Sequence, residues 1–253
     1  MSEYIVINTD DRITTLTITR PDKKNAITQD MYGAMADAIV AYGDNDDARA
    51  FVITGTGDMF TAGNDLQDFS TGAEDSHDLP PVGRFLNAIR DCPKPLIAAV
   101  NGQAIGVGLT MLLHCDLVYA ADSATFNAPF VKLGLVPEAA SSLLLPASVG
   151  MAVANDILLA GRKLNAEEAH RYGLVARIFP DAELSSAVKE IATIVAHSAP
   201  TALRRSKELI RNQRDRVAEH MAVEGRIFVE QLQSPDFAES VAAMMQKRAP
   251  VYS

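Results

Sequence analysis

Residues 97–108, Ile97-Ala98-Ala99-Val100-Asn101-Gly102-Gln103-Ala104-Ile105-Gly106-Val107-Gly108, predict an apolar strand, a loop containing glycine and the start of a helix. A short apolar run that ends at a glycine is typical of a buried strand. An earlier segment has the same plan, because Phe51-Val52-Ile53-Thr54-Gly55 leads through a loop to Ala62-Gly63-Asn64. The two segments predict a weak internal repeat of supersecondary units, and not the period of a solenoid.

The elements around these segments predict an α/β layered core, because strands alternate with helices. In chain order we expect a hairpin of strands at 4–9 and 12–19 with Asp10-Asp11 between them, a helix capped by Thr28 and running to about Tyr42, strands at 50–54 and 95–100, a helix at about 107–114 and a strand at 116–120.

The chain changes character after Pro137 and becomes mostly helical. Asn165-Ala166-Glu167-Glu168 has the pattern of a capping box, and Gly173 follows as the expected C′ residue. A further helix is expected from Asp181 to about His197, and Pro200 begins a helical tail that includes residues 202–214 and about 217–232. We therefore place a boundary near residue 198, with a core at 1–198 and a helical region at 199–253.

Composition narrows the class of protein. The 253 residues carry a net charge of −9, with 48% hydrophobic and 22% charged residues, which is ordinary for a globular chain and excludes a disordered one. The acidic balance argues against general binding of nucleic acid or anionic membranes. No apolar run approaches the ~18 residues of a membrane span, and the first residues lack a signal-peptide pattern. Cys92 and Cys115 are the only cysteines, and two cysteines cannot form a disulfide framework, which fits a reducing compartment. We therefore expect a cytoplasmic protein.

Several common catalytic signatures are missing from the sequence. It has no G-x-S-x-G elbow, no G-x-x-x-x-G-K-[ST] loop and no H-E-x-x-H motif. Gly106-Val107-Gly108 begins a G-x-G, but Met111 stands where a dinucleotide fingerprint needs its third glycine, which argues against nicotinamide binding. No metal site is expected, because metal-ligand spacing is absent from the histidines, which are His77, His114, His170, His197 and His220.

Two backbone turns next to glycines remain as candidates for chemistry. Glycine lets a backbone approach a ligand closely, and a helix start has free N–H groups with a partial positive charge. If the N–H groups of Asn64 and Val107 converge, they form an oxyanion hole, and one such donor stabilises a transition state by ~3–4 kcal/mol. The alternative is that both are tight turns that only close the fold.

Over nearly its whole length, the sequence resembles the crotonase, or enoyl-CoA hydratase/isomerase, superfamily. The matching segments are Arg20-Pro21 with Lys24-Asn25-Ala26, Phe60-Thr61-Ala62-Gly63-Asn64-Asp65-Leu66, Lys94 to Gly102 with Gly106-Val107-Gly108, Cys115-Asp116, Ala124-Thr125-Phe126, Ala160-Gly161, Ala166-Glu167-Glu168-Ala169 and Gly173-Leu174-Val175. Each segment alone is weak, but their combined spacing is specific.

The resemblance implies a spiral of ββα units at 1–198 that holds an acyl-CoA site, and a C-terminal helical region at 199–253 that forms a homotrimer or a homohexamer. It assigns the oxyanion hole to the backbone N–H groups of Asn64 and Val107. The acyl-CoA ligand is expected to contact Lys24, Ala26, Ala62, Gly63, Asn64, Asp65, Leu66, Gly106, Val107 and Phe130. Asp65 is expected to be structural, as a cap of the helix that begins there. The basic cluster of Arg20, Lys23 and Lys24 either meets CoA phosphates or is a solvated loop.

The reaction depends on which acids and bases are present. The resemblance places one hydratase glutamate at Thr110 and the other at Phe130, so both hydratase carboxylates are absent. Neither replacement can activate water as a carboxylate pair does. Glu138, in Gly134-Leu135-Val136-Pro137-Glu138, instead resembles the single catalytic glutamate of Δ3,Δ2-enoyl-CoA isomerases. Phe130 and the run Leu143–Leu145 could supply apolar walls that raise its pKa.

The resemblance to the isomerases implies an enzyme that moves the double bond of 3-enoyl-CoA to 2-enoyl-CoA. Glu138 would move the proton while the oxyanion hole holds a dienolate. No metal or redox cofactor is expected, since coenzyme A enters as part of the substrate. The alternatives are an enoyl-CoA hydratase or another crotonase reaction, and an acyl-CoA binding protein with little catalysis.

Overall fold

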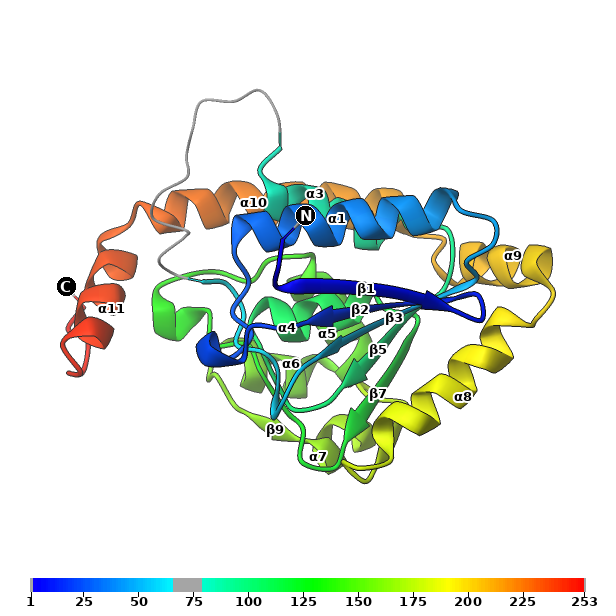
Figure 1. The fold of residues 1–253 in the computed structure, drawn as a ribbon. Coiled ribbons are helices and arrows are strands. Elements are labelled where there is room, and N and C mark those ends of the chain that lie inside the picture. Colours follow the sequence, from blue (N-terminus) through cyan, green and yellow to red (C-terminus); the bar gives the residue numbers. More distant parts are fainter. Residues whose placement is uncertain (1, 66–78, 253) are drawn as a thin grey trace.

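Strands form two sheets in residues 2–65 and 79–252, the parts of the chain that the computed structural model describes. The larger sheet has the order β1 (Ile5–Asp10), β2 (Ile13–Ile18), β3 (Ala50–Gly55), β5 (Leu96–Val100), β7 (Leu117–Ala121) and β10 (Arg177–Phe179). The smaller sheet has the order β4 (Met59–Thr61), β6 (Gln103–Ile105), β8 (Thr125–Asn127) and β9 (Leu164–Asn165). With helices on both sides of the larger sheet (Figure 1), the predicted α/β class is confirmed.

The predicted repeat corresponds to passages of the chain from the larger sheet to the smaller one. In the described residues these passages run from β3 to β4, from β5 to β6 and from β7 to β8, and the matching strands pair in parallel within each sheet. A Cβ built on Gly102, in the second passage, would lie 2.0 Å from the carbonyl oxygen of Asp58, so only glycine fits there. The third passage turns through Asp122-Ser123-Ala124 without glycine, which is why the sequence predicted two units. The expected ββα spiral is confirmed.

The chain begins with the predicted hairpin, although its turn is displaced by one residue. Asp10 pairs with Ile13, so the two turn residues are Asp11 and Arg12 rather than Asp10 and Asp11. Asp11 and Arg12 have φ values of 45° and 65°. A two-residue turn with both φ values positive matches the right-handed twist of the strands that it joins. The loop that follows β2 contains the short 3₁₀ helix η1 (Pro21–Lys23).

Helices α1 (Gln29–Asp44) and α3 (Pro81–Asp91) pack on each other along one side of the larger sheet, and α8 (Leu184–Ala196) lies across its other side (Figure 1). Thr28 caps α1 as predicted, because its hydroxyl accepts a hydrogen bond of 3.3 Å from the Met31 N–H. The buried face of α1 includes Met31, Tyr32, Met35 and Ile39. This face fixes α1 above the strands and brings Tyr32 to the interior.

Short helices connect the two sheets to the C-terminal region. They are α4 (Val107–Thr110), η2 (Met111–His114), η3 (Val131–Leu133), α5 (Ser141–Val149), α6 (Met151–Leu158) and α7 (Ala166–Arg171). The helix expected at 107–114 is therefore α-helical only to Thr110 and continues as a 3₁₀ turn. The predicted capping box at α7 is confirmed: the Glu168 N–H donates to the Asn165 side chain at 2.8 Å, and the Asn165 N–H donates to the Glu168 carboxylate at 3.2 Å.

The tail after Pro200 is helical, as the sequence predicts. It consists of α9 (Pro200–Ile210), α10 (Arg214–Leu232) and α11 (Pro235–Met245). Helix α10 contacts α3, and α11 lies beyond the end of α10 and contacts η3 (Figure 1). Leu209, Ile210, Val229 and Met245 are each more than half exposed, so this region presents apolar side chains on its surface. No helix in the described parts of the chain is long and apolar enough to cross a membrane.

An ion pair between the buried Lys207 and the partly buried Asp116 joins α9 to the larger sheet. The Lys207 ammonium donates to Asp116 Oδ2 and to the Lys94 carbonyl oxygen, both at 2.7 Å. The side chain of Lys207 is only 6% exposed. Asp116 also accepts a hydrogen bond from the Leu96 N–H at 2.8 Å, so it has a structural role.

We expect Lys207→Met to lower the free energy of unfolding by about 3 kcal/mol, because it removes a buried ammonium group and leaves the partly buried carboxylate of Asp116 without that partner. The loss should lie near the low end of the range for such pairs, since Arg211 Nε remains 3.4 Å from Asp116. Urea unfolding measures this change. Arg205→Met, which removes an exposed charge from the same helix, is the matched control. Equal unfolding midpoints for the two variants would contradict the prediction.

Candidate active site

The loop 20–26 is held against the segment that follows β3 by the buried side chain of Asn25. Its amide nitrogen donates to the carbonyl oxygens of Thr56, at 3.0 Å, and Met59, at 2.7 Å. The Arg20 N–H donates to the amide oxygen of Asn25 at 2.9 Å, and the Thr61 hydroxyl donates to its carbonyl oxygen at 2.6 Å. These hydrogen bonds hold the Lys24-Asn25-Ala26 segment against residues 56–61, although the two lie about 35 positions apart in the sequence.

Backbone hydrogen bonds then set the direction of the Asn64 peptide. The Ile27 N–H donates to the Gly63 carbonyl at 2.8 Å, and the Asp65 N–H donates to the Ile27 carbonyl at 2.9 Å. In such a parallel bridge the residues on either side of Asn64 make the bonds, so the N–H of Asn64 itself points away from Ile27. Within the described residues it has no hydrogen-bond acceptor.

The second predicted donor, the Val107 N–H, stands at the first position of α4. Gly106 precedes it with φ 59° and ψ −120° and is fixed by a 2.8 Å hydrogen bond from its N–H to the Asn127 carbonyl. The N–H groups of Leu109 and Thr110 bond back to Gly106, whereas the first N–H of a helix has no intrahelical partner. Val107 therefore presents a backbone donor at a helix start.

The two turns touch each other. A Cβ built on Gly63 would lie 2.8 Å from the Ile105 carbonyl oxygen, and one on Gly108 would lie 2.6 Å from the Thr61 side chain. Gly63 also has a φ of 92°, which favours glycine. The structure thus brings the turns that carry Asn64 and Val107 side by side, as an oxyanion hole needs.

Glu138 is a buried carboxyl group on the loop before α5, with 8% of its surface exposed. Thr110, on the last turn of α4, donates a hydrogen bond from its hydroxyl to Glu138 Oε1. Burial raises the pKa of Glu138 from its ordinary 4.5 to about 7, and the Thr110 hydrogen bond opposes this rise only in part. A carboxyl group with a pKa near 7 can both accept and return a proton at neutral pH.

The backbone after Glu138 is strained. Ala139 and Ala140 have φ values of 58° and 55°, in the left-handed region that disfavours alanine. The carbonyl of Ala139 accepts a 2.8 Å hydrogen bond from His114 Nε2. Burial lowers the pKa of His114 to about 4, so the ring is neutral at pH 7 and Nε2 carries the donated proton. Strain of this kind persists where the surroundings fix a functional turn.

Tyr32 is a buried side chain that contacts the Asn64 turn. Its hydroxyl donates a hydrogen bond to the side-chain oxygen of Asn64. Burial raises the pKa of Tyr32 well above 10, and the negative charge of Glu138 adds to this rise. The sequence reasoning missed Tyr32, although its position next to Met31 on the buried face of the helix was a signal for it.

The other residues predicted to contact the acyl-CoA ligand differ from one another in burial and in the segments that hold them. Ala26, Ala62 and Asp65 lie on the bonded segments around Asn25 and Ile27, and the Ala62 N–H donates to the Lys24 carbonyl at 3.0 Å. The side chain of Lys24 is exposed. Phe130 is buried in the main core, and Leu66 lies outside the described residues.

Arg20 and Asp65 form a pair that the sequence did not predict. Arg20 Nη1 lies 2.6 Å from Asp65 Oδ2 and 3.0 Å from the Ala26 carbonyl. Both side chains are about 15% exposed, so this part of the basic cluster is occupied by an internal partner. The helix that Asp65 was expected to cap would lie outside the described residues.

The run Leu143–Leu145 is divided between two environments. Leu145 is fully buried in the core. Leu143 and Leu144 line a cavity of about 420 Å³ together with residues of α9 and α10.

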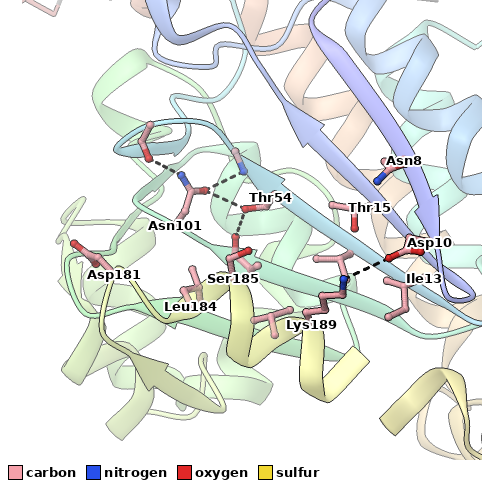
Figure 2. A pocket seen from close by; sticks show the side chains of 15 residues that line it. Asn8, Asp10, Ile13, Thr15, Thr54, Asn101, Asp181, Leu184, Ser185 and Lys189 are labelled. Carbon is pink, nitrogen blue, oxygen red and sulfur yellow. Dashed lines mark hydrogen bonds and ion pairs between the residues drawn. The ribbon is translucent and has the colours of Figure 1, made fainter. Parts of the chain in front are cut away.

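A further cavity of about 350 Å³ lies between the larger sheet and α8 and contains none of the predicted site residues (Figure 2). Its polar lining includes Thr54 and Asn101 from the sheet side, and Lys189 of α8, which forms an ion pair of 3.4 Å with Asp10. Among the described residues, no three His, Cys, Asp or Glu side chains come together as a metal site.

The chain matches known proteins over most of its length. A family model described as "Enoyl-CoA hydratase/isomerase" matches residues 8–253. Enoyl-CoA delta isomerase 2 of Rattus norvegicus is 41% identical over 224 residues, which cover 85% of this chain and 56% of the rat protein. This chain therefore spans little more than half of that relative.

Two other matches cover almost the full length of both this chain and the matched protein. Carnitinyl-CoA dehydratase of Salmonella typhi is 35% identical over 263 residues, covering 100% of this chain and 99% of that protein. A crystal structure of an enoyl-CoA hydratase/isomerase from Pseudoalteromonas atlantica T6c has a TM-score of 0.96 at 51% identity, covering 99% of this chain and 100% of that chain. With the family model matching almost the whole sequence, this chain belongs to the enoyl-CoA hydratase/isomerase family, the crotonase superfamily.

Proposed function

We propose that the protein is an enoyl-CoA isomerase that converts 3-enoyl-CoA to 2-enoyl-CoA. The observation that carries this proposal is the buried carboxyl group of Glu138, which has a pKa near 7 and accepts a hydrogen bond from Thr110. Thr110 stands where the resemblance places one of the two hydratase glutamates. One proton acceptor that later returns its proton is sufficient for a double-bond shift. The relatives named enoyl-CoA delta isomerase support this reaction class.

The proposed reaction has two proton transfers. The Glu138 carboxylate removes a proton from C2, and the electron pair of that C–H bond enters a dienolate whose negative charge lies on the thioester oxygen. The N–H groups of Asn64 and Val107 stabilise this oxygen. The protonated Glu138 then donates its proton to C4, and the double bond becomes C2=C3. The steps require no metal or redox cofactor, and coenzyme A takes part as the handle of the substrate.

The two hydrogen bonds made by Thr110 and Tyr32 have positioning roles in this proposal. Thr110 orients the Glu138 carboxylate from the same helix whose first N–H is the Val107 donor. Tyr32 holds the side chain of Asn64 and so limits rotation of that peptide. Lys23 and Lys24 are both exposed, and Lys24 lies beside the Ala62 segment, so both are cations available to a CoA phosphate.

An assay panel tests the reaction class. The protein is incubated separately with 3-enoyl-CoA and 2-enoyl-CoA, and the products are identified by mass and chromatography. Conversion of 3-enoyl-CoA to 2-enoyl-CoA, with no water added across the double bond and hence no change in mass, supports the isomerase. Formation of 3-hydroxyacyl-CoA alone would instead favour the hydratase class, to which the similarity with a carnitinyl-CoA dehydratase also points.

We also propose that residues 199–253 mediate assembly into a homotrimer or a homohexamer in the cytoplasm. The exposed apolar side chains of α9, α10 and α11 are the physical reason, because water contact with them is unfavourable. Light scattering at micromolar concentration should give three or six times the 27.2 kDa chain mass. A monomer would overturn this proposal.

A further inference from the structure

A second buried carboxylate lies at the N-terminus of α5, close to Glu138. Glu224 of α10 is 6% exposed. Its Oε1 accepts hydrogen bonds from the Ser142 N–H at 2.9 Å and from the Ser142 hydroxyl at 2.5 Å. Its Oε2 is buried and has no hydrogen-bond partner among the described residues. Glu224 is therefore bound through one carboxylate oxygen to Ser142, in the first turn of α5.

Glu224 and Glu138 act on the same short stretch of backbone. The Ser141 N–H donates to the Glu138 carbonyl at 3.0 Å, and the next residue, Ser142, is the one that Glu224 holds. The carboxylate of Glu224 therefore anchors the first turn of α5 directly after the strained turn that follows Glu138. Its charge also adds to burial in raising the pKa of Glu138.

Other titratable groups reach this part of the structure from three elements. They are Tyr32 on α1, His114 on η2 and His220 on α10. His220 Nε2 lies 2.8 Å from the Ser142 hydroxyl and 3.5 Å from Glu224 Oε1. The charges of Arg211, Arg90 and Asp91 act on His114. The acidic group whose charge raises the pKa of Glu138 is Glu224.

We propose that Glu224 is a positioning residue for the isomerisation: its carboxylate anchors Ser142 at the start of α5 and so holds the turn that carries Glu138. This inference rests on the proposed function, since it assumes that Glu138 is the base. No sequence motif points to Glu224, which lies 86 positions after Glu138.

Glu224→Gln is the direct test, because glutamine keeps the size and the oxygen that accepts from Ser142 but removes the charge. The measurement is kcat/KM for 3-enoyl-CoA as a function of pH. Since the ionised base is the active form, activity falls as the pH drops through the pKa of Glu138. Without the charge of Glu224 we expect this acid limb to move to lower pH by about one unit. The plateau at high pH should fall roughly threefold, because the neutral amide oxygen holds Ser142 less firmly than the carboxylate does.

Two further variants keep the test decisive. Glu219→Gln removes an exposed charge from the same helix and should leave both the acid limb and the plateau unchanged. Ser142→Ala removes one donor to Glu224 while keeping its charge, so the acid limb should move to higher pH; this variant remains informative if Glu224→Gln does not fold. A purely structural role of Glu224 would lower the plateau without moving the limb in either variant, and that result would overturn the inference.

Failure of this inference can be separated from failure of the proposed function. Glu138→Gln is measured in parallel with the same substrate. If Glu138→Gln abolishes isomerisation while Glu224→Gln leaves the acid limb in place, only the role of Glu224 is wrong. If Glu138→Gln retains full activity, the base assignment itself is wrong.

Discussion

Glu138→Gln is expected to lower kcat for the isomerisation of 3-enoyl-CoA by about 10²–10⁴-fold, because glutamine cannot accept the C2 proton. One group that serves both proton transfers should lie at the upper end of this range. Affinity for acyl-CoA should change little, since the turns at Asn64 and Val107 keep their backbone donors. Steady-state kinetics together with titration of a non-reactive acyl-CoA would separate the two effects.

Thr110→Val is the matched comparison for this variant. It removes the hydroxyl that donates to Glu138 but keeps the shape of the side chain. The loss of one positioning hydrogen bond should lower kcat by roughly tenfold or less. The sequence predicts only a mild effect because threonine is no base, and the structure adds the physical reason for a measurable one. If the Thr110 variant were inactive while Glu138→Gln remained active, Glu138 would not be the base.

The same Glu138 substitution should change how stability depends on pH. Burial raises the pKa of the folded carboxyl group from 4.5 to about 7, so the folded state binds this proton more tightly than the unfolded state. The resulting stabilisation is complete below about pH 4.5 and is lost as the pH rises through 7. Glu138→Gln should remove this dependence, on the order of 3 kcal/mol, from urea unfolding measured between pH 4.5 and 8.

Val107→Pro is expected to lower kcat by about 10²–10³-fold, because proline lacks the N–H that would stabilise the oxyanion. Val107 is the first residue of α4, a position at which proline is well tolerated in helices. The variant can therefore remove the donor while preserving the helix. Stopped-time assays with 3-enoyl-CoA, combined with circular dichroism to confirm folding, provide the measurement.

Val107→Ala is the control, since it retains the N–H and trims a buried side chain. It should keep turnover close to that of the wild type and cost only some stability. Unchanged turnover in a folded Val107→Pro protein would remove Val107 from the mechanism.

The fold could be predicted from the sequence because the patterns that indicate each helix and strand are local. The cap at Thr28, the capping box at Asn165 and Glu168, and the apolar strands that end in glycine each depend on residues within one element. Gly102 has to be glycine because the backbone of Asp58 passes within 2.0 Å of its missing Cβ. Such local requirements can be read from residue types and their spacing, and they predicted the α/β class and the repeated units.

The candidate site could be predicted only in part. Resemblance to the family nominated Asn64, Val107 and Glu138, while the sequence offered no means of learning what surrounds them. Thr110 stood out only as a missing glutamate, and Tyr32 did not stand out at all. Both proved to be hydrogen-bond donors to site residues. Their partners are 28 and 32 positions away, beyond the reach of any local pattern.

The sequence by itself determined the order of strands and helices and the glycines at the close turns. Only the tertiary structure decided the chemical character of Glu138. Its proton affinity depends on burial, on the Thr110 hydroxyl and on the charge of Glu224 in a distant helix. Electrostatic energies depend on distances in space and on exclusion of water, and neither follows from the separation of residues along the chain.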